Sequence, residues 1–288
     1  MQYFLYFCIL KQKFNNLLME KLKILYISQE ITPYLPESEI SNICRYLPQG
    51  IQEQGNEIRT FMPRFGKVNE RRNQLHEVIR LSGMNLVIND TDHPLIIKVA
   101  SIQAARMQVY FIDNEDFFSR KFVFTDEKGN FFKDNDERTL FFTRGVFETV
   151  KKLRWSPDII HCHGWFTGII PIYLKKIFYD DPLFLNSKII YSVYNDEFKG
   201  SLNKDFSNKI LFEGLKSDDV KPIKNATHEN ITKLAIDYSD AVIKGSKEIN
   251  PNIDKYLKSI DKPVLSYKND KQYIDAYSVF YHKLANSK

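Results

Sequence analysis

The hydrophobic pattern alternates between short, continuous apolar runs and longer stretches with helical spacing. The runs 22–28 (LKILYIS), 159–164 (IIHCHG) and 188–195 (KIIYSVYN) have the length and β-branched content of buried strands. Between such runs, apolar residues recur three and four positions apart, as at Ile40, Ile43, Leu47 and Ile51. Near-continuous apolar strands that alternate with helices predict an α/β fold with a parallel sheet covered on both faces.

The order of these runs predicts the elements of a doubly wound, Rossmann-like sheet. A first unit comprises a strand at 22–28, a helix from Ser38 that Pro48 is expected to kink, and a strand at 57–63. Three strand-like runs at 76–89, 94–101 and 105–113 have no long helix between them, so we expect an antiparallel excursion over 76–113. Helices are expected at 134–155 and 166–178, and the segment 230–258 predicts a helix, a strand at 241–244 and another helix.

The patterned region predicts one domain over residues 20–288. The segment 196–225 is poorly patterned, and a Lys- and Tyr-rich tail after Lys258 predicts one more helix. Residues 1–19 stand apart: the apolar run from Tyr3 to Leu10 is too short to span a bilayer, and its lysines follow it instead of preceding it as in a secretory signal. We expect Met19 to be the natural start and residues 1–18 to pack little against the domain. The alternative is a membrane-associating or partner-docking tail.

The amino-acid composition argues against several classes of function. The 288 residues are 43% hydrophobic and 27% charged, which is typical of a globular protein without a membrane span. The net charge of +5 is modest and both signs are interleaved, so we expect no nucleic-acid partner. Cys8, Cys44 and Cys162 are far apart and form no CxxC pair, which is consistent with a reducing cytoplasm.

His161 and His163 are the first candidate site residues. They end the strand at 159–163, and residues two apart on a strand share a face. Ligands of open α/β sheets bind outside the carboxyl ends of the strands, so both rings could face a ligand crevice while Cys162 points into the packing. A structural role, in which a histidine hydrogen-bonds near the strand end, is the alternative. No acid or further histidine at ligand spacing follows before Asp180, so no metal site is expected.

Several segments resemble, in order, the motifs of glycosyltransferase family five, the bacterial glycogen synthases and plant starch synthases. KILYISQEITPY is similar to the family's first strand and its S-x-E-V-A-P-F loop. YFIDNEDFFSR, FKDNDERTLFFTRGVFE and PDIIHCHGWFTGIIPIYLK are similar to later family motifs, the last to D-V-V-H-x-H-D-W-x-x-G-L-x-P-x-Y-L. YSVYNDEFKGSL is similar to T-I-H-N-L-A-Y-Q-G, and YSDAVIKGSKEI to the next motif. The resemblance covers about residues 22–249, and nothing after Ile249 resembles the family's second lobe.

The resemblance implies the N-terminal, acceptor-side lobe of a two-lobed GT-B enzyme. That enzyme class transfers glucose from ADP-glucose to the non-reducing end of an α-1,4-glucan with retention. An α-glucan and a nucleotide sugar are therefore the implied small-molecule partners, and no cofactor is implied. The ligand-pocket candidates carried over from the motifs are Glu30, His161, His163, Trp165, Tyr194 and Asn195.

The sequence departs from the family where the chemistry is concentrated. The family's K-T-G-G-L-x-D-V loop, a phosphate-binding type of sequence, falls on residues 36–43. Pro36 replaces the lysine, Ser38 and Glu39 replace the glycines, and Asn42 replaces the aspartate. Gly164 replaces the aspartate of H-x-H-D-W, and Tyr194 replaces the histidine of T-I-H-N. These changes place negative charge where a diphosphate needs donors.

Three functions remain open on the sequence. The chain could be a short glucan synthase, although it shows no cluster able to stabilise a departing diphosphate, so we expect it to be degenerate and inactive alone. It could instead be a non-catalytic module of glycogen metabolism that binds a glucan or a protein partner. Aromatic residues near strand ends would suit stacking on sugar rings, namely Tyr34, Trp165, Tyr194 and Phe198. A third possibility is a lobe that a separate polypeptide completes.

Overall fold

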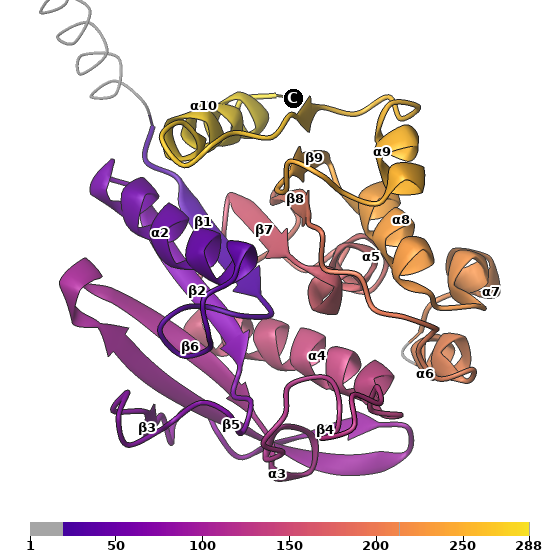
Figure 1. Cartoon of the computed structure of the whole chain (residues 1–288). Coiled ribbons are helices and arrows are strands. Elements are labelled where there is room, and N and C mark those ends of the chain that lie inside the picture. The colour runs from indigo at the N-terminus through magenta and orange to yellow at the C-terminus, as the bar shows by residue number, and fades with distance from the viewer. Residues whose placement is uncertain (1–19, 213, 288) are drawn as a thin grey trace, which may run out of the picture.

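A single ten-stranded sheet runs through the part of the chain that the computed structural model describes, residues 20–212 and 214–287 (Figure 1). The strand order is β10-β9-β8-β7-β1-β2-β6-β5-β3, and β4 pairs with β5 beside this path. The strands are β1 (Lys23–Ser28), β2 (Glu57–Pro63), β3 (His76–Glu77), β4 (Met84–Ile88), β5 (Thr91–Ile102), β6 (Met107–Asp113), β7 (Ile159–His163), β8 (Lys188–Val193), β9 (Ala241–Lys244) and β10 (Val264–Leu265).

The parallel part of the sheet confirms the predicted doubly wound architecture. From β10 through to β6, every neighbouring pair of strands is parallel. β1 lies between β2 and β7, with Ser28 opposite His163, so the two runs predicted to be neighbouring central strands are indeed neighbours. Their carboxyl ends meet at one edge of the sheet, where the loops after β1, β7 and β8 lie side by side.

The region 76–113 confirms the predicted antiparallel excursion. β4 and β5 form a hairpin whose turn residues, Asn89 and Asp90, have φ angles of 49° and 63°. Two left-handed residues in a two-residue turn match the right-handed twist of a hairpin, and Asn and Asp tolerate that conformation. β5 then pairs antiparallel with β6, which returns to the parallel sheet beside β2.

The helices connect and cover the strands. They are α2 (Glu39–Glu53), α3 (Glu115–Phe118), α4 (Asn135–Leu153), α5 (Ile170–Lys176), α6 (Phe206–Phe212), α7 (Ser217–Val220), α8 (His228–Tyr238), α9 (Pro251–Leu257) and α10 (Tyr273–Ala285), with 3₁₀ turns η1 (Gln103–Ala105), η2 (Trp165–Thr167) and η3 (Lys221–Ile223). α2 continues through Pro48, and α10 confirms the helix predicted for the tail.

Two predictions from the pattern differ from the structure. The helix expected at 166–178 is divided into η2 and α5, because the turn at Gly164 and Gly168 tightens the chain before Pro171 opens α5. The poorly patterned segment 196–225 contains α6, α7 and η3, which are too short to show helical periodicity. The prediction for residues 1–18 concerns residues outside those described.

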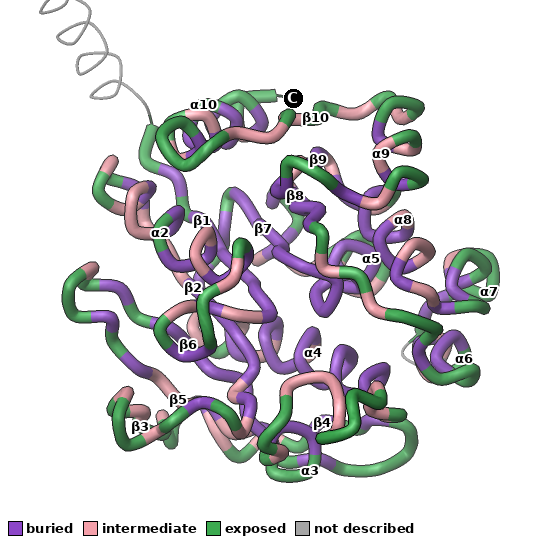
Figure 2. The backbone as a smooth tube through the Cα atoms, in the orientation of Figure 1, coloured by how far each residue is buried: buried purple, intermediate pink, exposed green. Residues whose placement is uncertain are grey.

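Two layers of helices bury the two faces of the sheet, and the buried positions follow the strands and the inner sides of the helices (Figure 2). On one face, Ile24 and Tyr26 of β1 pack against Leu47 of α2 and Tyr277 of α10. On the other face, the alternate β1 positions join a larger cluster that includes residues of α4, α5 and α8. Strand alternation places His161 and His163 on the α2 and α10 face, and Cys162 on the opposite face.

Candidate functional site

The loop after β1 brings Glu30 to the N-terminus of α2. Ser38 is the N-cap of α2: its hydroxyl accepts the amide hydrogen of Ser41 over 3.0 Å, and the Ser41 hydroxyl accepts that of Ser38 over 2.7 Å. The Ser38 hydroxyl also donates to the Glu30 carboxylate over 2.7 Å. This capping box satisfies backbone donors that a phosphate would otherwise use. Burial raises the pKa of Glu30, which the hydrogen bond from Ser38 partly offsets.

Glu39, in the first turn of α2, lies at the same helix end as Ser38 and connects it to the segment after β9. We call this group, Glu30, Ser38, Glu39 and Ser41, the α2 corner. Ser246, just after β9, donates a hydrogen bond from its hydroxyl to the Glu39 carboxylate. The Ser246 hydroxyl in turn accepts the backbone N–H of Asn195 over 3.0 Å. Glu39 is exposed, and so are Pro36 and Glu37 on the loop before it. The helix N-terminus, where an anion would be favoured, is thus occupied by the protein's own carboxylates.

His161 and His163 lie side by side on β7 and are wholly buried, with ring centroids 3.8 Å apart. The His161 Nδ1 lies 2.7 Å from the Tyr281 hydroxyl of α10, and its Nε2 lies 2.7 Å from the Ser192 hydroxyl of β8. The His163 Nδ1 lies 2.8 Å from the Tyr194 hydroxyl, while its Nε2 is buried without a hydrogen-bond partner. A ligand contact at either ring, predicted from the strand end, therefore requires the packing around Tyr281 or Tyr194 to open.

Burial also fixes the charge of this pair. It lowers the pKa of His163 to about 3 and holds the pKa of His161 well below its ordinary value, with a further decrease from the neighbouring His163. Both rings are therefore neutral at pH 7. Neutral rings in hydrogen bonds with tyrosine and serine hydroxyls connect β7 to α10 and β8.

Gly164 and Trp165 follow the histidines in a turn that excludes the family's aspartate. Gly164 has φ 83° and ψ 162°, a backbone region that only glycine adopts readily. A β-carbon there would lie 2.3 Å from the Gln29 Oε1, and that oxygen accepts the amide hydrogen of Phe166 over 3.2 Å. The buried Trp165 ring packs against three phenylalanines, Phe124, Phe131 and Phe198.

Tyr194 fills the position where the family motif has histidine. Its side chain is buried, and a β-carbon on Gly245 would lie 2.4 Å from its ring. Burial raises the pKa of Tyr194 well above its ordinary value, so the hydroxyl stays protonated. Tyr194 thus packs within the edge, whereas Asn195 beside it is exposed.

The sequence prediction missed an acid and a histidine at the same edge. Asp196 accepts the backbone N–H of Trp165 over 2.7 Å, and its other carboxylate oxygen lies 3.1 Å from the His228 Nε2 of α8. Asp196 directly follows the β8 run and Asn195, so its strand-end position was a signal that could have identified it. His228 lies in a segment without strand or motif pattern and could not be identified in that way.

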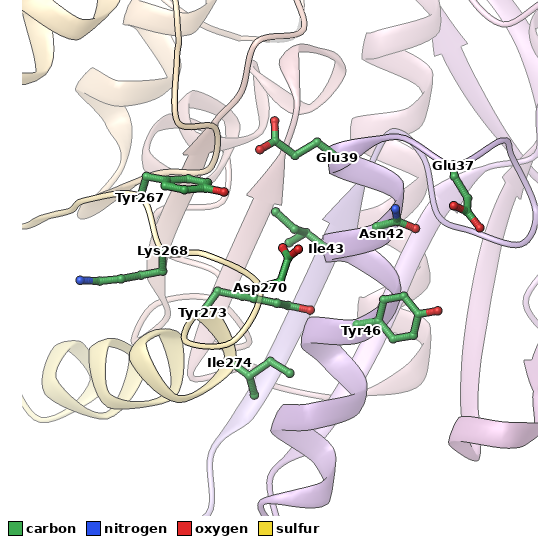
Figure 3. Close-up of a pocket in the computed structure, with 10 residues that line it drawn as sticks. All are labelled: Glu37, Glu39, Asn42, Ile43, Tyr46, Tyr267, Lys268, Asp270, Tyr273 and Ile274. Carbon is green, nitrogen blue, oxygen red and sulfur yellow. The ribbon is translucent and has the colours of Figure 1, made fainter.

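An open groove of about 730 Å³ lies beside this edge, between α2 and the segment that leads into α10 (Figure 3). It is lined by Glu39 and Asn42, which replace a glycine and the aspartate of the family's K-T-G-G-L-x-D-V loop, and by the exposed Glu37. Its other wall consists of residues 267–274, which the sequence analysis did not assign to any site. Among the described residues, no group of His, Cys, Asp and Glu is arranged to hold a metal ion. No helix in the described ranges is long and apolar enough to cross a membrane.

The family model of the starch synthase catalytic domain matches residues 23–257. The chain belongs to this family. Glycogen synthase of Chlorobium limicola is 37% identical over 196 residues, which are 68% of this chain and 40% of that protein. Glycogen synthase of Chlorobaculum tepidum is 32% identical over 252 residues, 86% of this chain and 49% of that protein. The chain thus spans less than half the length of these curated relatives.

The fold agrees with this assignment. The catalytic domain of starch synthase IV from Arabidopsis thaliana, solved with ADP and acarbose bound, matches with a TM-score of 0.65. The match covers 92% of this chain and 50% of that one, at 16% identity, and so establishes the fold alone. The lobe is of the GT-B type, as the resemblance implied. The starch synthase family membership therefore rests on the sequence matches.

Proposed function

We propose that this lobe of the starch synthase family does not transfer glucose from ADP-glucose by itself, and that it binds α-glucan. The observation that carries the proposal is the corner at the α2 N-terminus. There Ser38 and Ser41 cap the helix, Pro36 and Glu39 stand where the family has a lysine and a glycine, and the Glu30 carboxylate accepts the Ser38 hydroxyl.

Retaining transfer from a nucleotide sugar requires charge stabilisation of the departing diphosphate. A helix N-terminus with free N–H groups and a nearby cation supplies it in phosphate-binding loops. Here the N–H groups of Ser38 and Ser41 are bonded within the chain, and the neighbouring carboxylate of Glu30 is negative. Bringing a diphosphate to this corner would add like-charge repulsion, so ADP-glucose should bind weakly or not at all.

The proposed glucan contact uses the edge that is open in the structure. Asn195 is exposed beside β8, and Phe198 is half-buried against Trp165 and Phe131. An amide next to an aromatic ring is a common way to hold a sugar, because the amide bonds hydroxyls while the ring packs on the sugar face. Glu30, Trp165 and Tyr194 support this edge from beneath, and the histidine pair is proposed to stabilise its floor.

A second candidate is a lobe whose partner is a separate polypeptide. The match covers 40% and 49% of two curated glycogen synthases, and this candidate assigns the part of those proteins that is not matched to another chain. In this proposal residues 20–288 form one domain in the cytoplasm, and another chain supplies the donor-binding half. Adding the separately produced C-terminal half of a relative should then restore transfer, whereas no gain in transfer would refute this candidate.

The test of the main proposal is an assay of the purified chain with ADP-glucose and glycogen, beside separate titrations of each ligand. The expected result is glycogen binding without glucose incorporation. Asn195→Ala should weaken glycogen binding, and Asn85→Ala, at an exposed position of β4, serves as a matched control. Clear incorporation of glucose by the purified chain, or the absence of glycogen binding, would overturn the proposal.

A further inference from the structure

The groove beside α2 has walls from two distant parts of the chain. Ile43 and Tyr46 line it from α2, and Tyr267, Tyr273 and Ile274 line it from the C-terminal segment (Figure 3). Its volume of about 730 Å³ is in the range of small-molecule sites. Tyr46 is 51% exposed, so the groove is open to solvent along an aromatic wall.

The charges that face the groove are negative. Among the described residues that line it, Glu37, Glu39 and Asp270 are acidic, and Lys268 is the one lysine. Figure 3 shows the Lys268 side chain extending away from the other side chains, whereas the Asp270 carboxylate lies between the two walls. Glu37 and Asp270 are exposed and form no ion pair or hydrogen bond with another described residue. The carboxylates of Glu37 and Asp270 in the groove therefore form no ion pair with a cation of the described residues.

Tyr273 presents a polar group to the groove. The residue is only 7% exposed and lines the groove, and its hydroxyl forms no hydrogen bond with another described residue. The hydroxyl is not among the buried side-chain atoms, so it is open to solvent in the groove, where it can bond to a ligand. Burial, with the nearby Asp270, raises the pKa of Tyr273 to about 12, so this hydroxyl is neutral and able to accept or donate.

We propose that this groove binds a small aliphatic polyamine, a ligand with at least two ammonium groups joined by methylene segments. Ammonium groups match the unneutralised carboxylates of Glu37 and Asp270 and can lie against tyrosine ring faces. Methylene segments match the apolar surface of Ile43 and Ile274, which line the same groove. The groove thus favours a positively charged ligand, whereas a nucleotide sugar is negatively charged. This site goes beyond the proposed glucan binding and does not depend on it.

The test is isothermal titration of the full chain with spermidine at low salt. Asp270→Asn is expected to weaken binding about tenfold, because one ammonium loses its counter-charge. Tyr273→Phe keeps the ring and removes the unpartnered hydroxyl, and a loss of about threefold is expected. Tyr267→Leu should also cost about threefold through the lost ring face. Glu127→Gln removes an equal charge from an exposed position outside the groove and should leave the affinity unchanged.

Two outcomes would overturn the proposal. One is the absence of spermidine binding to a chain that is folded by circular dichroism. The other is equal weakening by Asp270→Asn and Glu127→Gln, which would indicate general attraction to a charged surface. Maltotriose titrated in parallel distinguishes a sugar site: maltotriose binding that Asp270→Asn and Tyr267→Leu weaken, without spermidine binding, would assign the groove to carbohydrate. Glycogen binding elsewhere on the chain would be unaffected, so this failure is separable from failure of the proposed function.

Discussion

The histidine pair and the acidic groove lie on the same face of the sheet, and one helix contacts both. Tyr273, Tyr277 and Tyr281 are four residues apart on α10 and so form one stripe along it. At one end of the stripe Tyr273 lines the open groove, and at the other Tyr281 is hydrogen-bonded to His161 in a sealed interior. Residues of similar chemistry thus serve as packing where they are covered and as a candidate site where they are not.

The same contrast between covered and open positions applies to the residues that match the family motifs and to those that differ from them. The retained histidines and Trp165 are wholly or almost wholly buried, where a substitution would leave partners unsatisfied or open a cavity. Of the positions that depart, Pro36 and Glu39 are exposed, and a change there affects charge more than packing. The buried retained residues are therefore evidence for the fold, and the exposed departures are evidence about the chemistry.

The largest expected effect is a loss of folding stability at acid pH, caused by the buried pair His161 and His163. Because the folded pKa of each histidine lies below its ordinary value of 6.5, the unfolded chain binds more protons below that pH. The stabilisation is complete above about pH 6.5 and is lost as the pH falls, so between pH 7 and pH 5 each ring should cost about 2 kcal/mol. Urea unfolding at the two pH values measures this cost. A His161→Gln, His163→Gln double variant should flatten the dependence, and an unchanged slope would contradict the burial argument.

His161→Ala is the next largest expected effect. It removes a buried ring and leaves the hydroxyls of Tyr281 and Ser192 without their partner, so the free energy of unfolding should fall by about 3 kcal/mol. The exposed His76→Ala is the matched control and should change it by less than about 0.5 kcal/mol. Equal effects in urea unfolding would show that the pair is not sealed.

Gly164→Asp, which restores the family's residue, should destabilise the chain by about 2 kcal/mol because of the positive φ. Removing the Gln29 side chain in the same protein relieves the close contact with the new β-carbon but not the backbone strain. The double variant should therefore recover only part of the loss in thermal unfolding. Full stability of Gly164→Asp alone would show that the turn accommodates the aspartate.

The smallest expected effect on stability belongs to the exposed corner. Changing Pro36→Lys, Ser38→Gly and Glu39→Gly together replaces the cap with glycine, which is tolerated at an N-cap, and adds one glycine to the first helical turn. The free energy of unfolding should fall by about 1 kcal/mol, which urea unfolding would detect. A loss as large as that of His161→Ala would mean that the corner is part of the core.

Much of the fold follows from the sequence because apolar runs determine which segments are buried. The central strands and the antiparallel excursion were predicted from such runs, and Asn89-Asp90 marks its hairpin turn. The short helices α6 and α7 were not predicted, because a helix of one or two turns is too short to show a hydrophobic period. The site was harder: His161 meets Tyr281 across 120 residues, and no local pattern shows that α10 covers a strand end. The groove likewise joins α2 to residues 267–274, which only the tertiary structure brings together.

The most direct test of the central claim is a titration of ADP-glucose into the wild-type chain and into the Pro36→Lys, Ser38→Gly, Glu39→Gly variant. The claim is that the α2 corner, through its own caps and carboxylates, excludes a diphosphate. The wild-type chain should bind weakly or not at all, and the variant should bind at least about tenfold more tightly, since a cation and open N–H groups replace a carboxylate and a cap. An affinity that the three substitutions leave unchanged, or tight binding by the wild-type chain, would contradict the claim.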